Sequence, residues 1–300
     1  MEIIDKIQKL KKEKNAIILV HNYQLPEIHD IADYIGDSLG LSIEAAETKA
    51  DVIVFCGVYF MAETAKILSP EKIVLIPEKS AGCPMADMIT ADQLRTLKAQ
   101  HPGATVMCYV NTTADVKAEC DLCCTSANAV RMAGEVLRDE KEIIFVPDQY
   151  LAAYTAKQTG RNFIVWKGYC PIHASILPDH IREQRNLHPE ADVIVHPECT
   201  PEVIEAADRA LSTEGMIRYA KESEKKEFII GTEIGILYRL RKECPGKIFY
   251  PASDQAVCQN MKLTTLEKVC LALENMSHEV IVPEEVRGKA KTCIERMLRS

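Results

Sequence analysis

The sequence predicts an α/β fold made of three homologous units, whose parallel sheets are related by pseudo-threefold symmetry around a central active site. Three observations lead to this prediction. Short runs rich in Val and Ile recur along the chain, amphipathic helical segments lie between them, and the same landmarks return about every 87 residues. Strands that alternate with helices are typical of parallel sheets joined by helical crossovers.

The expected strands are continuous apolar runs, as in sheets that are buried on both faces. They cover residues 16–20, 51–55, 72–76, 105–110, 142–146, 162–166, 192–195, 227–230 and 247–250. Helical spacing of apolar residues marks segments 59–68, 150–160 and 234–244, as well as the N-terminal segment that carries Ile3, Ile7 and Leu10. The 300 residues suffice for three small domains, each with its own core.

Four landmarks keep one order in each third of the chain, which indicates an internal repeat. A strand ends, a pair of residues with at least one hydroxyl follows, a second strand ends, and a lone cysteine closes the unit. These landmarks are His21, Asn111 and His196; Asp37-Ser38, Thr125-Ser126 and Ser212-Thr213; Gly57, Pro147 and Gly231; and Cys83, Cys170 and Cys258. Because ligands bind at the carboxyl ends of parallel strands, we expect the three units to face one site.

Composition and charge exclude several classes of function. The chain is 47% hydrophobic and 27% charged, as in ordinary globular proteins, and its formal net charge of −8 argues against nucleic acid or an anionic membrane as a partner. The charged N-terminal segment does not resemble a secretory signal, and no apolar run has the length of a membrane span. We therefore expect a cytoplasmic protein.

The twelve cysteines are numerous for a cytoplasmic chain, in which a disulfide framework is not expected. Most are expected to be small buried apolar residues. Cys120, Cys123 and Cys124 form a CxxCC cluster that is expected at the end of a helix. This cluster could bind zinc or take part in redox chemistry, although no second CxxC completes a zinc site.

Cys83, Cys170 and Cys258 differ from the other cysteines because they lie in loops at equivalent positions of the repeat. Three converging thiolates without a fourth ligand suit a [4Fe–4S] cluster with one open iron, and plain structural thiols are the alternative. An open iron would act as a Lewis acid on a carbonyl, hydroxyl or carboxylate during addition or dehydration.

Polar residues at the expected strand ends could bind and transform an anionic substrate. The hydroxyl pairs precede helical segments, so they are either ordinary N-caps or three helix N-termini aimed at one cavity, where they would bind carboxylates or a phosphate. His21, Tyr23, Tyr109, Asn111, His173, His196 and Glu198 add proton donors and bases. A lone His is more often structural, but these residues lie where loops carry function.

The motifs "HNYQLPEIHDIADYIGDSL", "GVYFMAETAKIL", "CPMAD", "YVNTTADVKA", "CTSANAV", "CPIH", "VHPEC", "GTEIG" and "AVCQNMK" together resemble the quinolinate synthase family of de novo NAD biosynthesis, in the family's order from about residue 15 to 265. The resemblance implies three α/β/α domains and a transferase that condenses iminoaspartate with dihydroxyacetone phosphate to quinolinate, releasing phosphate and two waters. It also implies that an aspartate dehydrogenase or oxidase supplies the iminoaspartate.

The resemblance assigns a role to each matching residue. Cys83, Cys170 and Cys258 would hold the [4Fe–4S] cluster, and Tyr23, Glu198, His173 and Tyr109 would act as acids and bases. Substrate would be bound by His21, Ser38, Tyr109, Asn111, Ser126, His196, Glu198, Ser212 and Thr213. Some family members carry a C-terminal CxxC, whereas only Cys293 stands there in this chain, so a redox switch at that end is not expected.

The repeat divides the chain into four expected segments. Residues 1–86, 87–173 and 174–262 would be the three α/β repeats, and residues 263–300 would be C-terminal helices that pack back on them. Three other functions compete with a quinolinate synthase: an iron–sulfur hydro-lyase that acts on another hydroxy acid, an iron–sulfur sensor or electron carrier, and a structural zinc protein.

Overall fold

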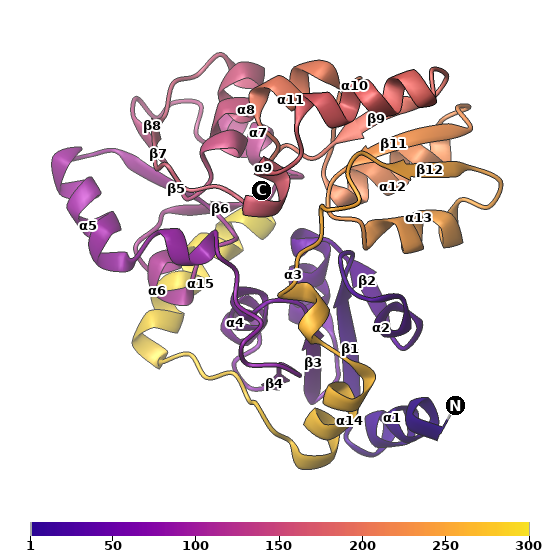
Figure 1. Cartoon of the computed structure of the whole chain (residues 1–300). Coiled ribbons are helices and arrows are strands. Elements are labelled where there is room, and N and C mark those ends of the chain that lie inside the picture. The colour runs from indigo at the N-terminus through magenta and orange to yellow at the C-terminus, as the bar shows by residue number, and fades with distance from the viewer. Residues whose placement is uncertain (1, 300) are drawn as a thin grey trace.

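Three four-stranded parallel sheets form the framework of the protein. The computed structural model describes residues 2–299. The strand orders are β2-β1-β3-β4, β6-β5-β7-β8 and β10-β9-β11-β12, so each sheet repeats one topology. Figure 1 shows the three sheets set around a common centre. The predicted fold class, α/β with three parallel sheets, is confirmed.

The first sheet, with its helices, is formed by residues 2–88. Its elements are α1 (Glu2–Glu13), β1 (Ala16–His21), α2 (Pro26–Asp30), β2 (Tyr34–Gly36), α3 (Ser38–Glu47), β3 (Val52–Cys56), α4 (Tyr59–Leu68), β4 (Ile73–Leu75) and the 3₁₀ turn η1 (Ala86–Met88). All residues of β3 are buried, as expected for a strand that is covered on both faces.

The second sheet follows the same plan, with one irregular helix. Its elements are α5 (Ala91–Gln100), β5 (Thr105–Tyr109), α6 (Ala114–Lys117), β6 (Leu122–Cys124), α7 (Ala129–Arg131), the π turn η2 (Met132–Val136), β7 (Ile143–Val146), α8 (Gln149–Thr159), β8 (Ile164–Val165) and α9 (Pro171–Ala174). The counterpart of α3 is therefore broken into a single α turn followed by a π turn.

The third sheet is followed by two helices that return to the other sheets. The elements are α10 (Pro178–Leu187), β9 (Asp192–Val195), α11 (Pro201–Ala206), β10 (Arg209–Ala210), α12 (Thr213–Glu222), β11 (Glu227–Gly231), α13 (Ile236–Glu243), β12 (Ile248–Pro251), η3 (Met261–Leu263), α14 (Leu266–Asn275) and α15 (Glu284–Arg299). Helix α14 packs on α1 and β3, and α15 packs on β6, α6 and α4.

All nine strands expected from the apolar runs are present, and the three strands that were not expected share one position. They are β2, β6 and β10, each of which forms the edge of its sheet beside the first strand of its unit. Each has only two or three residues, too few for a periodic signal. The expectation that Cys123 and Cys124 lie at the end of a helix is wrong, because both belong to β6.

An aspartate fixes each edge strand to the central part of its sheet. Each aspartate lies 15 residues after a residue of the neighbouring strand and accepts a hydrogen bond of 2.8 Å from the backbone N–H of that residue. The three aspartates are Asp33, Asp121 and Asp208. The backbone N–H of each aspartate donates to the carbonyl of that same residue, which is Ile18, Val106 or Val193. The three aspartates are a further element of the repeat, and they satisfy polar groups that the short edge strand leaves unpaired.

No helix within residues 2–299 combines the length and the apolar character that a membrane span requires.

We predict that Asp121→Ala lowers the free energy of unfolding by about 1–2 kcal/mol, because the N–H of Val106 loses a charged acceptor within the sheet. Asp121→Asn, which keeps an acceptor oxygen, should lose less. Urea unfolding measures both variants, with Asp254→Ala at an exposed position as the control. Equal midpoints for Asp121→Ala and Asp254→Ala would contradict the proposed role of the aspartate.

Candidate active site

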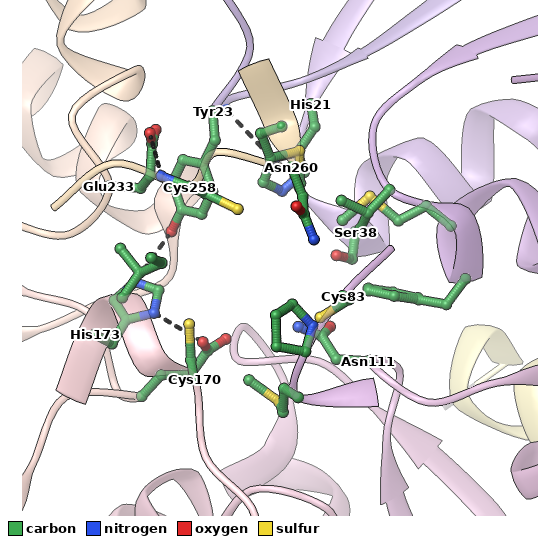
Figure 2. A pocket seen from close by; sticks show the side chains of 18 of the residues that line it. His21, Tyr23, Ser38, Cys83, Asn111, Cys170, His173, Glu233, Cys258 and Asn260 are labelled. Atoms are coloured by element: carbon green, nitrogen blue, oxygen red, sulfur yellow. Dashed lines mark hydrogen bonds and ion pairs between the residues drawn. The ribbon is translucent and has the colours of Figure 1, made fainter. Parts of the chain in front are cut away.

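A cavity of about 210 Å³ lies where the three units meet. Its wall includes His21 at the end of β1, Tyr109 at the end of β5 and His196 directly after β9. Since every sheet is parallel, these carboxyl ends come from the same edge of each sheet. Figure 2 shows side chains from all three units pointing into this space.

The cavity brings together nearly all the site residues expected from the sequence. Its lining contains His21, Tyr23, Ser38, Cys83, Tyr109, Asn111, Ser126, Cys170, His173, His196, Glu198, Thr213 and Cys258. Ser212 is not among the lining residues, because its hydroxyl caps α12 by accepting from the N–H of Gly215 at 3.2 Å. For Ser212 the ordinary N-cap is therefore the observed role.

Cys83, Cys170 and Cys258 are the cysteines of the cavity wall, and each projects into the space from a different unit. Their local structure is alike, since each precedes a single helical turn: η1, α9 or η3. In each case a backbone N–H three residues later, that of Ala86, His173 or Met261, donates to the sulfur and works to lower the thiol pKa. Burial outweighs these bonds and raises the pKa of all three thiols, that of Cys83 to about 12.

Three sulfurs that receive similar backbone bonds are suited to a shared metal group, because hydrogen bonds to sulfur stabilise thiolate ligands of iron–sulfur clusters. The three cavity sulfurs are not all within 4.8 Å of one another, so they do not form a compact site for a single metal ion. Among the described residues, the groups that are this compact are Cys108, Cys123 and Cys293, and Cys170, His173 and Glu198. The wider spacing of the cavity thiols is compatible with a polynuclear cluster, whose sulfur ligands lie on different iron atoms.

Glu198 is a buried carboxylate at the centre of the polar network. Its Oε1 accepts a short hydrogen bond from the hydroxyl of Tyr109, and its Oε2 lies 2.9 Å from Nδ1 of His173, which is ion-pair distance without hydrogen-bond alignment. Burial would raise the pKa of Glu198, but the two histidines and the Tyr109 hydroxyl outweigh it and lower the pKa to about 2. Glu198 is therefore ionised at neutral pH.

Tyr23 joins this network from the opposite side. Its hydroxyl lies 2.6 Å from Oγ1 of Thr232, which in turn lies 2.8 Å from Nε2 of His173. Burial, followed by the charge of Glu198, raises the pKa of Tyr23 and of Tyr109, so both phenols stay protonated. A continuous set of polar contacts thus connects two tyrosine donors through one histidine and one carboxylate.

His21 and His196 are held neutral, and each presents Nε2 as a possible donor. Nδ1 of His21 accepts from the N–H of Tyr23 at 3.2 Å, and Nδ1 of His196 accepts from the N–H of Glu198 at 3.3 Å. These bonds assign the proton of each neutral ring to Nε2. Burial lowers the pKa of both imidazoles to about 3. Nε2 of His196 lies 3.1 Å from the hydroxyl of Ser126.

Two helix N-termini face the cavity, where three were expected. Ser38 and Thr213 are the first residues of α3 and α12, and both line the wall. The third is irregular: the N–H of Ala129 donates to the carbonyl of Thr125 at 2.9 Å, and the turn after Thr125 leads into α7, which has three residues. Oδ1 of Asn128 accepts from the N–H of Thr125 at 2.7 Å.

Several residues that sequence reasoning did not single out hold the site together. Thr232 links Tyr23 to His173. Glu233, which is fully buried, accepts from the N–H of Cys258 at 3.1 Å and pairs with Lys262 at 2.9 Å. Nδ2 of Asn260 donates to the carbonyl of Gly82 at 2.7 Å and so connects two of the cysteine loops. Thr232 and Glu233 belong to the motif "GTEIG". The position of this motif at the end of β11 was the sequence signal that could have identified both residues.

The cavity wall contains no Lys or Arg among the described residues, although it carries the carboxyl groups of Asp37, Glu198 and Glu233. An anionic ligand would therefore be bound by backbone N–H groups, hydroxyls and imidazoles. Asn111 adds a free acceptor, since its buried Oδ1 has no hydrogen-bond partner.

Comparison with known proteins agrees with this arrangement. The family model described as quinolinate synthetase A protein matches residues 5–299, which extends the resemblance seen in the motifs almost to both ends of the chain. The chain is 59% identical over 297 residues to a quinolinate synthase of Dehalococcoides mccartyi (strain CBDB1), covering 99% of this chain and 98% of the relative. It is 54% identical over 294 residues to a quinolinate synthase of Methanoregula boonei, covering 98% of this chain and 97% of the relative.

We predict that the free energy of unfolding falls as the pH is lowered from about 7 to about 5, partly because of His21 and His196. The ordinary pKa of histidine is 6.5, and both residues have a pKa of about 3 in the folded chain. At pH values between these two, the unfolded chain therefore binds protons at these residues that the folded chain does not bind. A His21→Gln/His196→Gln double variant should lose less Tm over this pH range than the wild type. His101→Gln, at the end of α5 outside the cavity, is the control. An equal loss in the double variant would contradict this assignment.

Proposed function

This chain belongs to the quinolinate synthetase A protein family, and from that premise we propose that it is a quinolinate synthase of NAD biosynthesis. The substrates would be iminoaspartate and dihydroxyacetone phosphate, and the products quinolinate, phosphate and two waters. The observation that carries this proposal is the meeting of three thiols, one from each unit, beside a buried network of acids and bases in one cavity.

We further propose that Cys83, Cys170 and Cys258 hold a [4Fe–4S] cluster. The cavity wall offers these three thiols and no fourth within the described chain, and each receives a backbone N–H from a helical turn. When bound, such a cluster supplies one open iron that acts as a Lewis acid on a substrate oxygen. The thiols are protonated in the metal-free protein, so ligation requires the loss of their protons.

The anionic groups of the substrates would be bound without a basic side chain. The N-termini of α3 and α12 present Ser38 and Thr213 together with the positive ends of two ten-residue helices. His21 and Ser126 supply further donors, and the partner-free Oδ1 of Asn111 can accept from a substrate hydroxyl or imine. This mode of binding explains how a protein with a net charge of −8 could take up two anionic substrates.

The proton transfers would run between Tyr23, His173, Glu198 and Tyr109. The raised pKa values of the tyrosines make both phenols donors, while the ionised Glu198 keeps a negative charge beside them. Thr232 and Glu198 hold His173 between the two tyrosines, so a proton given to substrate by Tyr23 can be replaced through the imidazole. Burial of these groups excludes water from the proton transfers.

We predict that Cys83→Ala gives a folded, colourless protein that forms no quinolinate. The measurements are iron and sulfide content after anaerobic purification, and product analysis with iminoaspartate and dihydroxyacetone phosphate. Cys270→Ala, in α14 away from the cavity, is the control and should keep iron and activity. Retention of the cluster absorption and of turnover by Cys83→Ala would refute the ligand assignment. Dehydration of another hydroxy acid by a wild-type protein that makes no quinolinate would favour the hydro-lyase.

We predict that Tyr23→Phe lowers kcat by roughly 10²–10⁴-fold, the range typical of a lost general acid, and leaves the iron content unchanged. The fold should persist, because Thr232 keeps its contact with His173. Steady-state kinetics of quinolinate formation separate kcat from KM. Tyr154→Phe, whose hydroxyl contacts Ala210 outside the cavity, is the matched control. An unchanged kcat in Tyr23→Phe would contradict the role of Tyr23 as general acid, whereas a wild-type protein with a reversible redox couple and no turnover would favour a sensor or electron carrier.

A further inference from the structure

A second group of thiols lies between the sheet of the middle unit and the C-terminal helix. The sulfurs of Cys108 in β5 and Cys123 in β6 are 3.4 Å apart, and those of Cys123 and Cys293 in α15 are 3.3 Å apart. All three sulfur atoms lie within 4.8 Å of one another, and all three residues are fully buried and free of disulfides. The group is separate from the cavity, whose wall contains none of these residues.

Cys120 is a further thiol next to this group. Its side chain lies within reach of Cys108, but its sulfur donates to the carbonyl of Val116 at 3.0 Å and is not among the sulfurs mutually within 4.8 Å, so it would join them by turning away from that carbonyl. Cys120 and Cys123 form a CxxC pair, the spacing that places two ligands on one zinc ion. The CxxC therefore needs no second CxxC, because β5 and α15 each supply one of the missing ligands.

The geometry is close to that of a tetrahedral sulfur site. Zn–S bonds of about 2.3 Å place the sulfurs of such a site about 3.8 Å apart. The observed separations of 3.3 and 3.4 Å are slightly below this value, and the third pair lies within 4.8 Å. Cys108 and Cys123 are register partners on adjacent strands, so the sheet itself holds these two ligands in place.

A buried cation supplies a second, independent observation. Lys117 is fully buried and makes no ion pair within 4 Å among the described residues, although its charge works to lower the pKa of the nearby Glu63 carboxyl. Its Nζ contacts the carbonyls of Val110 and Thr112 and lies 5.3 Å from the centre of the Phe60 ring. Its charge acts on Cys108, Cys120 and Cys293. A buried ammonium group without a direct ion pair is costly, so a thiolate centre beside Lys117 would add to the negative charge that Glu63 supplies.

We propose that Cys108, Cys120, Cys123 and Cys293 form a structural zinc site that fastens α15 to the middle sheet. The ion offsets two of the four thiolate charges and Lys117 offsets a third, which leaves one negative charge at the buried centre. Four cysteine ligands close the coordination shell, so the site is structural rather than catalytic. The same Lys117 holds the carbonyls on both sides of Asn111, and it thereby connects the zinc site to the cavity wall.

The test is the metal content of the full chain. Protein expressed with added zinc salt and purified anaerobically with a thiol reductant is analysed for zinc and iron by mass spectrometry. We expect about one zinc ion per chain in the wild type, besides iron. Cys293→Ala should lose the zinc and keep the iron, whereas Cys83→Ala should keep the zinc and lose the iron. Cys270→Ala, a buried helical cysteine outside both groups, should keep both metals.

The zinc and iron contents of the variants test this proposal and the iron–sulfur assignment separately. Zinc far below one per chain in the wild type, or zinc that is retained in Cys293→Ala, overturns the zinc site whatever the iron result. If Cys293→Ala does not fold, Cys83→Ala loaded with Co²⁺ replaces it. Thiolate-to-cobalt charge-transfer bands with tetrahedral d–d absorption support the site, and their absence overturns it. Zinc binding should also raise the Tm of the metal-depleted chain, as for any ligand that binds only the folded state.

Discussion

The direction of the strands is the constraint on which the rest of the structure depends. In each of the three sheets all neighbouring strands are parallel, so all carboxyl ends lie at one edge, and the loops that follow them must turn there. When three such edges meet, residues that are about 90 residues apart in sequence line one cavity. His21, Tyr109 and His196 are neighbours for this reason, not because of any local motif.

The buried charge of Glu198 organises the polar side of that cavity. A carboxylate in this position is stabilised by Tyr109 at the end of β5 and by His173 in α9, which come from distant parts of the chain. The thiols adjoin this network, since the sulfur of Cys170 lies within 4.8 Å of ligand atoms of both His173 and Glu198. Thiols, acids and bases, and two helix N-termini thus share one space.

The repeat also explains features that the individual residues do not. Asp33, Asp121 and Asp208 fasten the three edge strands in the same way, and the three cavity cysteines receive an N–H from the third residue that follows each of them. The middle unit departs from the pattern at two places. It breaks the helix that would follow Ser126, and it contains the thiols of the proposed zinc site. The middle unit lacks a regular helix after Ser126 and is covered by α15, so a metal crosslink to α15 would stabilise this unit.

The sequence by itself determined the fold class, the nine strands that lie in apolar runs, the repeat and the cysteines that would face a common site, because apolar runs and recurring landmarks are local signals. It did not determine the edge strands β2, β6 and β10, which are too short to show a period and depend on pairing with β1, β5 and β9. Nor could it show that Thr232 joins Tyr23 to His173, or that Cys293 meets Cys108 and Cys123. Those contacts join different elements of the chain, and the free energy of packing, rather than local propensity, decides them.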